Sequence, residues 1–170
     1  MMFTEQNKMI QELAQKIAKE QIAPRAKEVD EKGETPWENI KLLAENGFFG
    51  INVPEEYGGV GSDMVSHVLA VEEIASACAS TSVYLSTQAL ALAPFLIAGT
   101  EEQKQKYATR LASGEVLGSF GITEPGAGSD VSSIRTSAVK EGDVYRLNGH
   151  KTLDRKSTRL NSRHKTESRM

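Results

Sequence analysis

The sequence predicts an α+β protein, in which an all-α N-terminal domain is followed by the first strands of a truncated antiparallel β domain. Apolar residues recur at helical spacing through the first two thirds of the chain, and this periodicity changes near Gly114. The runs of β-forming residues beyond that point include two separated by Glu141-Gly142-Asp143, which is typical of a hairpin. We therefore assign residues 1–114 to a helical domain and residues 115–153 to the start of a β domain.

Composition and charge indicate a globular protein and limit the partners that it can bind. Of the 170 residues, 39% are hydrophobic and 25% are charged, which is typical of a globular protein. The net charge is −3 and basic residues gather after Asp154, so the body of the chain is acidic. Because nucleic acid binding needs a basic surface, we expect no nucleic acid partner.

Three further features favour a cytoplasmic protein. The single cysteine, Cys78, cannot form an internal disulfide, which is typical of a reducing compartment. The N-terminus lacks the basic start and apolar core of a signal peptide. The most apolar run, Ala89 to Ala98, is shorter than the about 20 residues that cross a bilayer, so we expect no membrane partner.

The first helix is expected to begin after Thr4, whose hydroxyl can cap the first turn. One face of this helix follows the i, i+3, i+4, i+7 pattern of burial, through Ile10, Leu13, Ala14 and Ile17. Pro24 is expected to kink or end the helix, because its ring removes a backbone donor and crowds the preceding turn.

A second helix has a better marked start. Thr35 and Glu38 have the spacing of a capping box, with Pro36 at the first helical position, where its missing N–H costs nothing. This helix is expected to end near Gly47, and its inward residues are Trp37, Ile40, Leu43 and Ala44. Residues 53–59, Val-Pro-Glu-Glu-Tyr-Gly-Gly, are rich in turn formers and predict a loop.

Further helical segments complete the all-α domain. One apolar stripe, at alternating spacings of four and three, comprises Met64, Val68, Val71, Ala75 and Cys78. Residues 83–92 are apolar on most sides, which predicts a helix buried at the centre of the domain. Thr100 and Gln103 have capping-box spacing and predict the start of another helix.

The expected β domain opens with short runs at residues 116–123, 133–140 and 144–148. The first run leads into the sequence Phe120-Gly121-Ile122-Thr123-Glu124-Pro125-Gly126-Ala127-Gly128-Ser129-Asp130. In residues 120–129, which we call the glycine loop, backbone N–H groups and two hydroxyls can face a planar polar ligand or a phosphate. A plain structural turn explains the same composition, and neither common phosphate-binding motif is present.

The glycine loop resembles the flavin-binding signature of the acyl-CoA dehydrogenases. Other segments match the family in order and spacing, namely residues 53–59, Glu72-Glu73-Ile74-Ala75, Gly99-Thr100-Glu101-Glu102-Gln103-Lys104 and Leu111-Ala112-Ser113-Gly114-Glu115. The resemblance covers residues 3 to about 152. It is greatest to the short-chain, butyryl-type bacterial members.

The resemblance implies FAD as cofactor and a role for each matching residue. In the family, residues at these positions hold FAD, here Phe120, Gly121, Ile122, Thr123, Gly126, Gly128 and Ser129. Ile122 and Thr123 lie at the pyrimidine end of the flavin ring, where fixed donors stabilise the negative charge of reduction. Ser129 lies where the flavin pyrophosphate approaches the pantetheine of the substrate, so it is also a substrate-binding candidate.

The family reaction implies the activity and partners of the whole protein. A carboxylate base removes the α-proton of an acyl-CoA while the β-hydrogen leaves as hydride to the flavin, which gives a trans-2-enoyl-CoA. The resemblance also implies electron transfer to an electron-transferring flavoprotein and assembly as a homotetramer.

The sequence departs from the family pattern after Thr152. A second flavin segment begins with Asn148-Gly149-His150-Lys151-Thr152, but Leu153-Asp154-Arg155 stands where the family continues Trp-Ile-Thr. The catalytic glutamate of the family belongs to a C-terminal helical domain, and no carboxylate here matches it, Glu124 included. We therefore assign no catalytic residue and expect an N-terminal fragment that is inactive alone.

Other interpretations stay open from the sequence. The chain also fits a non-catalytic helical binding module that keeps only the fold, or a related flavoenzyme such as an acyl-CoA oxidase.

No metal site is expected, because His67, His150 and His164 lack the spacing of metal ligands. Residues 154–170 are basic and poor in apolar residues and resemble translated adapter DNA, so we expect a disordered, non-native tail rather than a nucleic-acid-binding arm.

Overall fold

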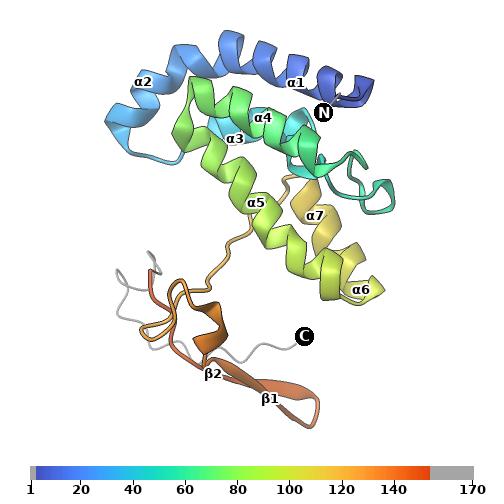
Figure 1. Ribbon diagram of the computed structural model, residues 1–170, viewed down its shortest axis with the longest axis vertical. Helices are drawn as coiled ribbons and strands as arrows, with labels where there is room; N and C mark the ends of the chain where they lie inside the picture. The colour runs from blue at the N-terminus through green and yellow to red at the C-terminus, as the bar shows by residue number, and fades with distance from the viewer. Residues whose placement is uncertain (1–2, 154–170) are drawn as a thin grey trace. The chain divides into compact units, whose positions relative to one another are not determined.

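The structure is a computed structural model that describes residues 3–153 and divides into two compact units. Unit 1, up to Ser119, is helical, and unit 2, from Phe120 onward, contains the strands (Figure 1). The expected α+β fold class is confirmed, with a helical N-terminal region followed by two antiparallel strands. The expected tail, residues 154–170, lies outside the described residues.

The first helix, α1 (Glu5–Ile17), begins as predicted after Thr4. The Thr4 hydroxyl accepts a hydrogen bond from the Asn7 amide at 3.1 Å, and the Asn7 side chain accepts one from the Thr4 amide at 2.9 Å. This reciprocal pair is a capping box, with Asn7 in the place usually taken by Glu or Gln. Ala14 and Ile17 are buried as predicted, whereas Leu13 is exposed.

Pro24 is predicted to kink or end the first helix. It does not end the helix, because helical structure continues to Lys32. A π-helical segment, Ala18–Ile22, joins α1 to α2 (Ala23–Lys32), and Pro24 lies in the first turn of α2. A wider turn before the proline accommodates the missing backbone donor. The chain leaves α2 at Gly33, which has a left-handed φ of 59°.

Helix α3 (Trp37–Glu45) starts differently from the prediction. Pro36 occupies the N-cap position, no side chain of residues 3–153 caps the helix, and Glu38 instead pairs with Arg25 at 2.7 Å, so the predicted capping box is wrong. Ile40 and Leu43 are buried as expected. Trp37 is 65% exposed, so its predicted inward orientation is also wrong.

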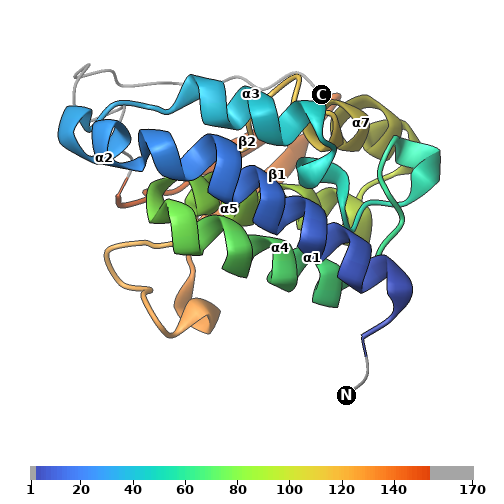
Figure 2. The same ribbon diagram turned by 90° about the horizontal axis from the view of Figure 1, so that it is seen from above.

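Helix α4 (Met64–Ala77) buries only part of its predicted apolar stripe, of which Cys78 is buried and Val71 packs against the core. Met64 and Val68 are more than half exposed, and the buried residues are instead Ser66, His67, Leu69, Ala70 and Ile74. The polar Ser66 is tolerated there because its hydroxyl accepts a hydrogen bond from Asn7 of α1 at 2.8 Å. α1 lies along α4, as Figure 2 shows from above.

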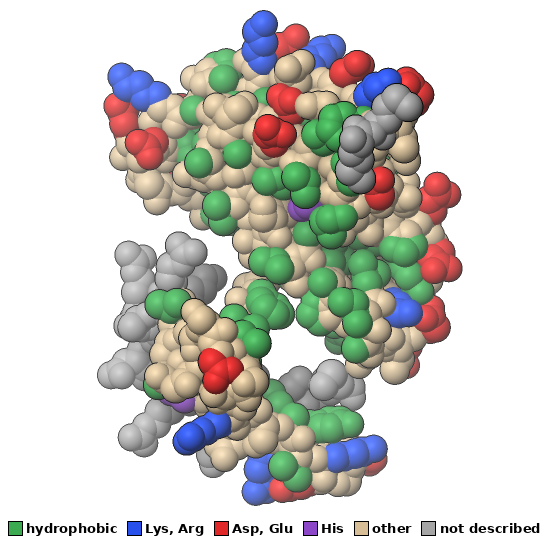
Figure 3. All heavy atoms as spheres, in the orientation of Figure 1, with side chains coloured by type: hydrophobic (Ala, Val, Ile, Leu, Met, Phe, Trp, Pro, Cys, Tyr) green, Lys and Arg blue, Asp and Glu red, His purple; other side chains and the backbone are tan. Residues whose placement is uncertain are grey.

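Helix α5 (Ala79–Ala98) is buried on one face only, which corrects the expectation of a fully buried central helix. The inward residues are Thr81, Ser82, Leu85, Gln88, Ala91 and Leu92. Val83, Leu90 and Ile97 are exposed, and Figure 3 shows hydrophobic side chains gathered over the surface of unit 1 around α5, α6 and α7. By length and composition alone α5 could cross a bilayer, but a core helix of a soluble protein passes the same test.

Two apolar clusters hold unit 1 together. The larger lies where α1, α3, α4 and α5 meet, and its fully buried side chains include Ile22, Leu43, Phe48, Phe49, Ile74 and Leu85. Each such side chain contributes about 1.5–3 kcal/mol through the apolar surface it removes from water. The smaller cluster joins the loop at Val53 and Tyr57 to Leu92 of α5 and to Leu111.

The last helical segment of unit 1 begins at Thr100, whose capping box with Gln103 is confirmed. α6 (Glu101–Gln103) continues through a π-helical segment, Lys104–Ala108, into α7 (Thr109–Ala112). The segment between α7 and unit 2 is not a strand, so the predicted strand at residues 116–123 is wrong.

Unit 2 contains the predicted hairpin. β1 (Ser137–Glu141) pairs antiparallel with β2 (Val144–Asn148), in a register that places Val139 opposite Arg146. Gly142 of the turn has a φ of 63°, which favours glycine. The predicted run at 133–140 forms a strand only from Ser137 onward, and all residues of both strands are exposed.

Candidate functional site

The glycine loop precedes the hairpin in unit 2 and folds around one tight turn. The amide of Glu124 donates to the Ala127 carbonyl at 3.0 Å, and the amide of Ala127 donates back to Glu124 at 3.1 Å. Pro125 and Gly126 lie between them and are exposed. The two reciprocal bonds fix the middle of the loop and leave its two arms on the surface.

Three glycines of this loop are not required by the packing of the chain itself. Gly121, Gly126 and Gly128 do not have a left-handed φ, and a Cβ atom at any of them would meet no described atom within 4 Å. Gly149 differs, because a Cβ there would lie 2.1 Å from the Thr136 hydroxyl oxygen. The open space beside the loop glycines fits the close approach of a group that is not part of this chain.

The loop also carries hydrogen-bond donors that the chain does not use. Within residues 3–153, no hydrogen-bond partner is found for the backbone amides of Gly121, Ile122, Thr123, Gly126, Gly128 and Ser129. The hydroxyls of Thr123 and Ser129 are equally without a partner in this part of the chain. A run of unpaired N–H and O–H groups on an exposed loop suits an anionic or carbonyl-bearing ligand.

A buried carboxylate underlies the loop. Glu124 is only 7% exposed, and one of its oxygens accepts from the Arg135 amide at 2.8 Å. Its other oxygen accepts from the Thr136 amide at 3.0 Å, from the Thr136 hydroxyl, and from the Lys151 ammonium at 2.9 Å. We call these four residues the Glu124 network.

The Glu124 network determines the protonation state of its carboxylate. The hydrogen bond from the Thr136 hydroxyl, then that from the Arg135 amide and that from Lys151, lower the pKa of Glu124 to about 2. A carboxylate with so low a pKa is a weak base. Glu124 is therefore poorly suited to proton abstraction.

The same network brings the two expected flavin segments together. Lys151 donates a second hydrogen bond, of 2.8 Å, to the Ile122 carbonyl, and the Thr152 amide donates to the Thr123 carbonyl at 2.9 Å. Phe120 and Ser129, in contrast, make no recorded hydrogen bond within the described chain. Phe120 is 47% exposed.

Sequence reasoning did not find the roles of Glu124, Thr136 and Lys151. The signal for Lys151 was its place in the Asn-Gly-x-Lys turn, and the signal for Glu124 was a carboxylate directly before Pro-Gly. A hollow of about 550 Å³ lies beside these groups, and its lining is Glu124, Pro125, Gly126, Ser133, Arg135, Thr136, Asn148, Gly149 and His150.

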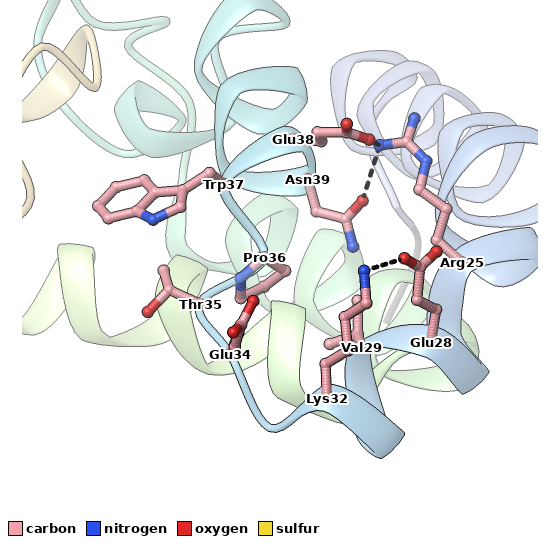
Figure 4. Close-up of a pocket in the computed structure, with 10 residues that line it drawn as sticks. All are labelled: Arg25, Glu28, Val29, Lys32, Glu34, Thr35, Pro36, Trp37, Glu38 and Asn39. Atoms are coloured by element: carbon pink, nitrogen blue, oxygen red, sulfur yellow. Dashed lines mark hydrogen bonds and ion pairs between the residues drawn. The ribbon is translucent and has the colours of Figure 1, made fainter.

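A second hollow, of about 260 Å³, lies in unit 1 between α2 and the start of α3 (Figure 4). Its cations are already engaged, because Arg25 pairs with Glu38 at 2.7 Å and Lys32 pairs with Glu28. Asn39 accepts a long hydrogen bond from Arg25 and donates to Thr81 at 2.9 Å. With its two cations paired, this hollow is a weaker candidate than the glycine loop. No group of three His, Cys, Asp or Glu side chains within residues 3–153 is placed to hold a metal ion.

Comparisons with a family model and with individual proteins point to the same family. The model of the acyl-CoA dehydrogenase N-terminal domain matches residues 4–115. A probable acyl-CoA dehydrogenase of Bacillus subtilis is 48% identical over 149 residues, covering 87% of this chain and 39% of the relative. A subunit of the caffeyl-CoA reductase–Etf complex of Acetobacterium woodii is 46% identical over 155 residues, covering 90% and 41%.

Among solved structures, butyryl-CoA dehydrogenase of Megasphaera elsdenii superposes with a TM-score of 0.79 at 38% identity. The match covers 88% of this chain and 40% of that structure. The chain thus spans about two fifths of the length of the relatives that it matches.

Proposed function

This chain belongs to the acyl-CoA dehydrogenase family, and we propose that it is the N-terminal part of an FAD-dependent enzyme that oxidises acyl-CoA thioesters to trans-2-enoyl-CoA. One observation carries the proposal, namely the glycine loop with its unused donors and its open glycines. Because a flavin offers acceptors at its pyrimidine edge and anionic oxygens at its pyrophosphate, both ends of the cofactor fit such a loop.

The residues of the loop divide this task. When bound, FAD would accept the hydride that leaves the acyl chain. The free amides of Ile122 and Thr123 would donate to the pyrimidine edge and stabilise negative charge there. The amide and hydroxyl of Ser129 would bind the pyrophosphate on one side and the pantetheine of acyl-CoA on the other. The catalytic base, in this proposal, comes from sequence beyond these 170 residues.

The proposed partners follow from the proposed reaction. The substrate is an acyl-CoA, and the electron acceptor is an electron-transferring flavoprotein, which is supported by a relative that is named as a subunit of an Etf complex. We further propose a homotetramer located in the cytoplasm.

One relative favours a second candidate. The Acetobacterium woodii protein is named as a subunit of a caffeyl-CoA reductase complex, so the same scaffold occurs in a reductase. An acyl-CoA oxidase and a non-catalytic binding module are the remaining alternatives. The candidates differ in measurable ways, namely the direction of turnover, the use of oxygen and the presence of flavin.

A chimera tests the proposal. Residues 3–152 of this chain would replace the matching part of the Megasphaera elsdenii butyryl-CoA dehydrogenase. We expect a yellow protein that reduces an acceptor dye with butyryl-CoA. Thr123→Val in the chimera removes a free hydroxyl of the glycine loop and should weaken FAD binding, and Thr87→Val, in the half-buried part of α5, is the matched control.

Each other outcome selects a different candidate. A folded chimera without flavin would contradict the proposal and favour the binding module. Hydrogen peroxide formed in place of dye reduction would favour an oxidase. Turnover only with reduced dye and an enoyl-CoA would favour the reductase.

A further inference from the structure

Two segments that are far apart in the sequence lie side by side in unit 2. Residues 122–124 of the glycine loop contact residues 151–152 through three hydrogen bonds of 2.8 to 2.9 Å. Two of these bonds come from one group, the Lys151 ammonium. Lys151 is thus the side chain on which the contact between the two segments chiefly depends.

We propose that Lys151 is a positioning residue of the cofactor site. Lys151 joins the two segments by binding carbonyl and carboxylate groups of the glycine loop, and it so leaves the N–H groups of the loop available to a ligand. This inference rests on the proposed function, because it assigns the joined segments to FAD. Lys151 acts through the Ile122 carbonyl and the Glu124 carboxylate, so its role is to position these groups.

The distribution of hydrogen bonds supports this role. Lys151 and the Thr152 amide engage the carbonyl groups of Ile122 and Thr123, while the amides of the same two residues have no partner within residues 3–153. Acceptors are therefore held inside the protein, and donors are left for a ligand. A ligand edge that becomes negative on reduction needs this polarity.

Burial explains why the position requires a cation. The Glu124 side chain is 6% exposed and the Lys151 side chain 31% exposed, so their ion pair is largely removed from water. A buried carboxylate that loses its cationic partner is strongly disfavoured. Because Glu124 also binds the Arg135 and Thr136 amides, it anchors Lys151 to the base of the hairpin.

The charge of Lys151 does not reach the ligand as a free charge. Glu124 neutralises it at 2.9 Å, so the contribution of Lys151 is to geometry rather than to the electrostatic potential of the site. This separates Lys151 from an ordinary cationic binding residue, whose loss would weaken binding without moving the backbone.

Amide hydrogen exchange of the full 170-residue chain, followed by NMR, tests the proposal. In Lys151→Met, we expect the Thr152 amide to exchange at least about tenfold faster, because two hydrogen bonds from a charged group are lost. Lys140→Met is the matched control, since Lys140 is an exposed lysine of β1 with no ion pair recorded in the described chain. The Gly118 amide, in unit 1, reports that the chain remains folded.

Glu124→Gln is the second variant, because its amide oxygen still accepts from Arg135 and Thr136 while the ion pair is lost. We expect faster Thr152 exchange here too, by a smaller factor. Unchanged Thr152 exchange in Lys151→Met would overturn the proposal. An equal change in Lys140→Met would overturn it as well, since the effect would then follow net charge.

Adding FAD to the same samples separates this inference from the proposed function. In the unchanged chain, we expect FAD to shift the amide signals of the glycine loop and of Thr152 together. In Lys151→Met, we expect the Thr152 signal no longer to shift when FAD is added. If FAD shifts no signal in the unchanged chain, residues 120–152 do not hold FAD on their own and the chimera decides the proposed cofactor, while the exchange data still decide whether Lys151 joins the two segments.

Discussion

The side-chain amide of Gln88, in the middle of α5, accepts a hydrogen bond of 2.8 Å from the backbone amide of Gly118. Its nitrogen donates to the carbonyls of Leu111 at 2.7 Å and of Val116 at 2.8 Å. Gln88 is 1% exposed, so this one side chain satisfies three backbone groups in the core. It holds the segment that leaves α7 against α5.

Replacing Gln88 with Leu should therefore destabilise unit 1. The change keeps the volume but leaves one backbone donor and two acceptors without partners, and we expect a loss on the order of 3 kcal/mol in the free energy of unfolding. Chemical denaturation followed by circular dichroism measures this. Gln15→Leu, on the exposed side of α1, is the matched control and should change stability by less than about 0.5 kcal/mol. Equal midpoints for the two variants would contradict the assignment.

Asn7 should be a second sensitive position, because it connects the starts of two helices. Its nitrogen donates to the Asp63 carboxylate and to Ser66, both at 2.8 Å, and its oxygen completes the capping box of α1. We expect Asn7→Leu to cost about 2 kcal/mol, since a helix cap and buried hydrogen bonds are lost together. Thermal unfolding measures the loss.

Asn46→Leu provides the comparison for Asn7. The Asn46 side chain is exposed, and within residues 3–153 it bonds only the Leu42 carbonyl one turn back. We expect this variant to unfold close to the temperature of the unchanged chain. If it were destabilised as much as Asn7→Leu, the link between α1 and α4 would not explain the effect.

Sequence reasoning succeeded where the signal is local. The N-cap at Thr4, the capping box at Thr100 and the hairpin turn at Gly142 depend on residues a few positions apart, and all three are confirmed. The predicted box at Thr35 failed because Glu38 pairs with Arg25, which lies 13 residues away. A local pattern gives no information about such a competing partner.

Apolar periodicity located α4 but only part of its buried face. Ser66 is fully buried because Asn7, 59 residues away, meets its hydroxyl, while Met64 and Val68 face solvent. An apolar stripe indicates a face that avoids water, but not the neighbour that covers it. For the same reason, the apolar pattern of α5 did not indicate that one side of this helix is exposed.

The candidate site shows the same division. The residue pattern indicated the glycine loop, but the Glu124 network was missed because its donors lie 11, 12 and 27 residues from Glu124. Two of those donors are backbone amides, of Arg135 and Thr136, which leave no trace in residue identity. The roles of the loop residues toward FAD stay a prediction.

The Glu124 network should make unit 2 sensitive to acid. Since the folded pKa of Glu124 is lowered to about 2, against about 4.3 for an unperturbed Glu, its stabilisation is present above about pH 4.3 and is lost as the pH falls toward 2. The amide signals of Arg135 and Thr136 should report this loss. In Glu124→Gln they should no longer respond in that window, and an unchanged titration would contradict the assignment.

Tyr57 should produce the opposite dependence, at alkaline pH and in unit 1. Its hydroxyl donates to the Glu101 carboxylate at 2.7 Å, and this bond, with burial and the charges of Glu101 and Glu56, raises the pKa of Tyr57 to about 12. The bond needs the protonated phenol, so its contribution is complete below about pH 10 and is lost as the pH rises toward 12.

Tyrosinate absorbance and unfolding should be followed together in the unchanged chain and in Tyr57→Phe. The difference between the two titrations is the ionisation of Tyr57, and we expect it near pH 12, accompanied by weaker packing of the 53–59 loop. In Glu101→Gln the same step should move toward pH 10, because the main cause of the shift is removed while Lys104 stays in place. A Tyr57 step already at pH 10 in the unchanged chain would show that the Glu101 bond does not form in solution.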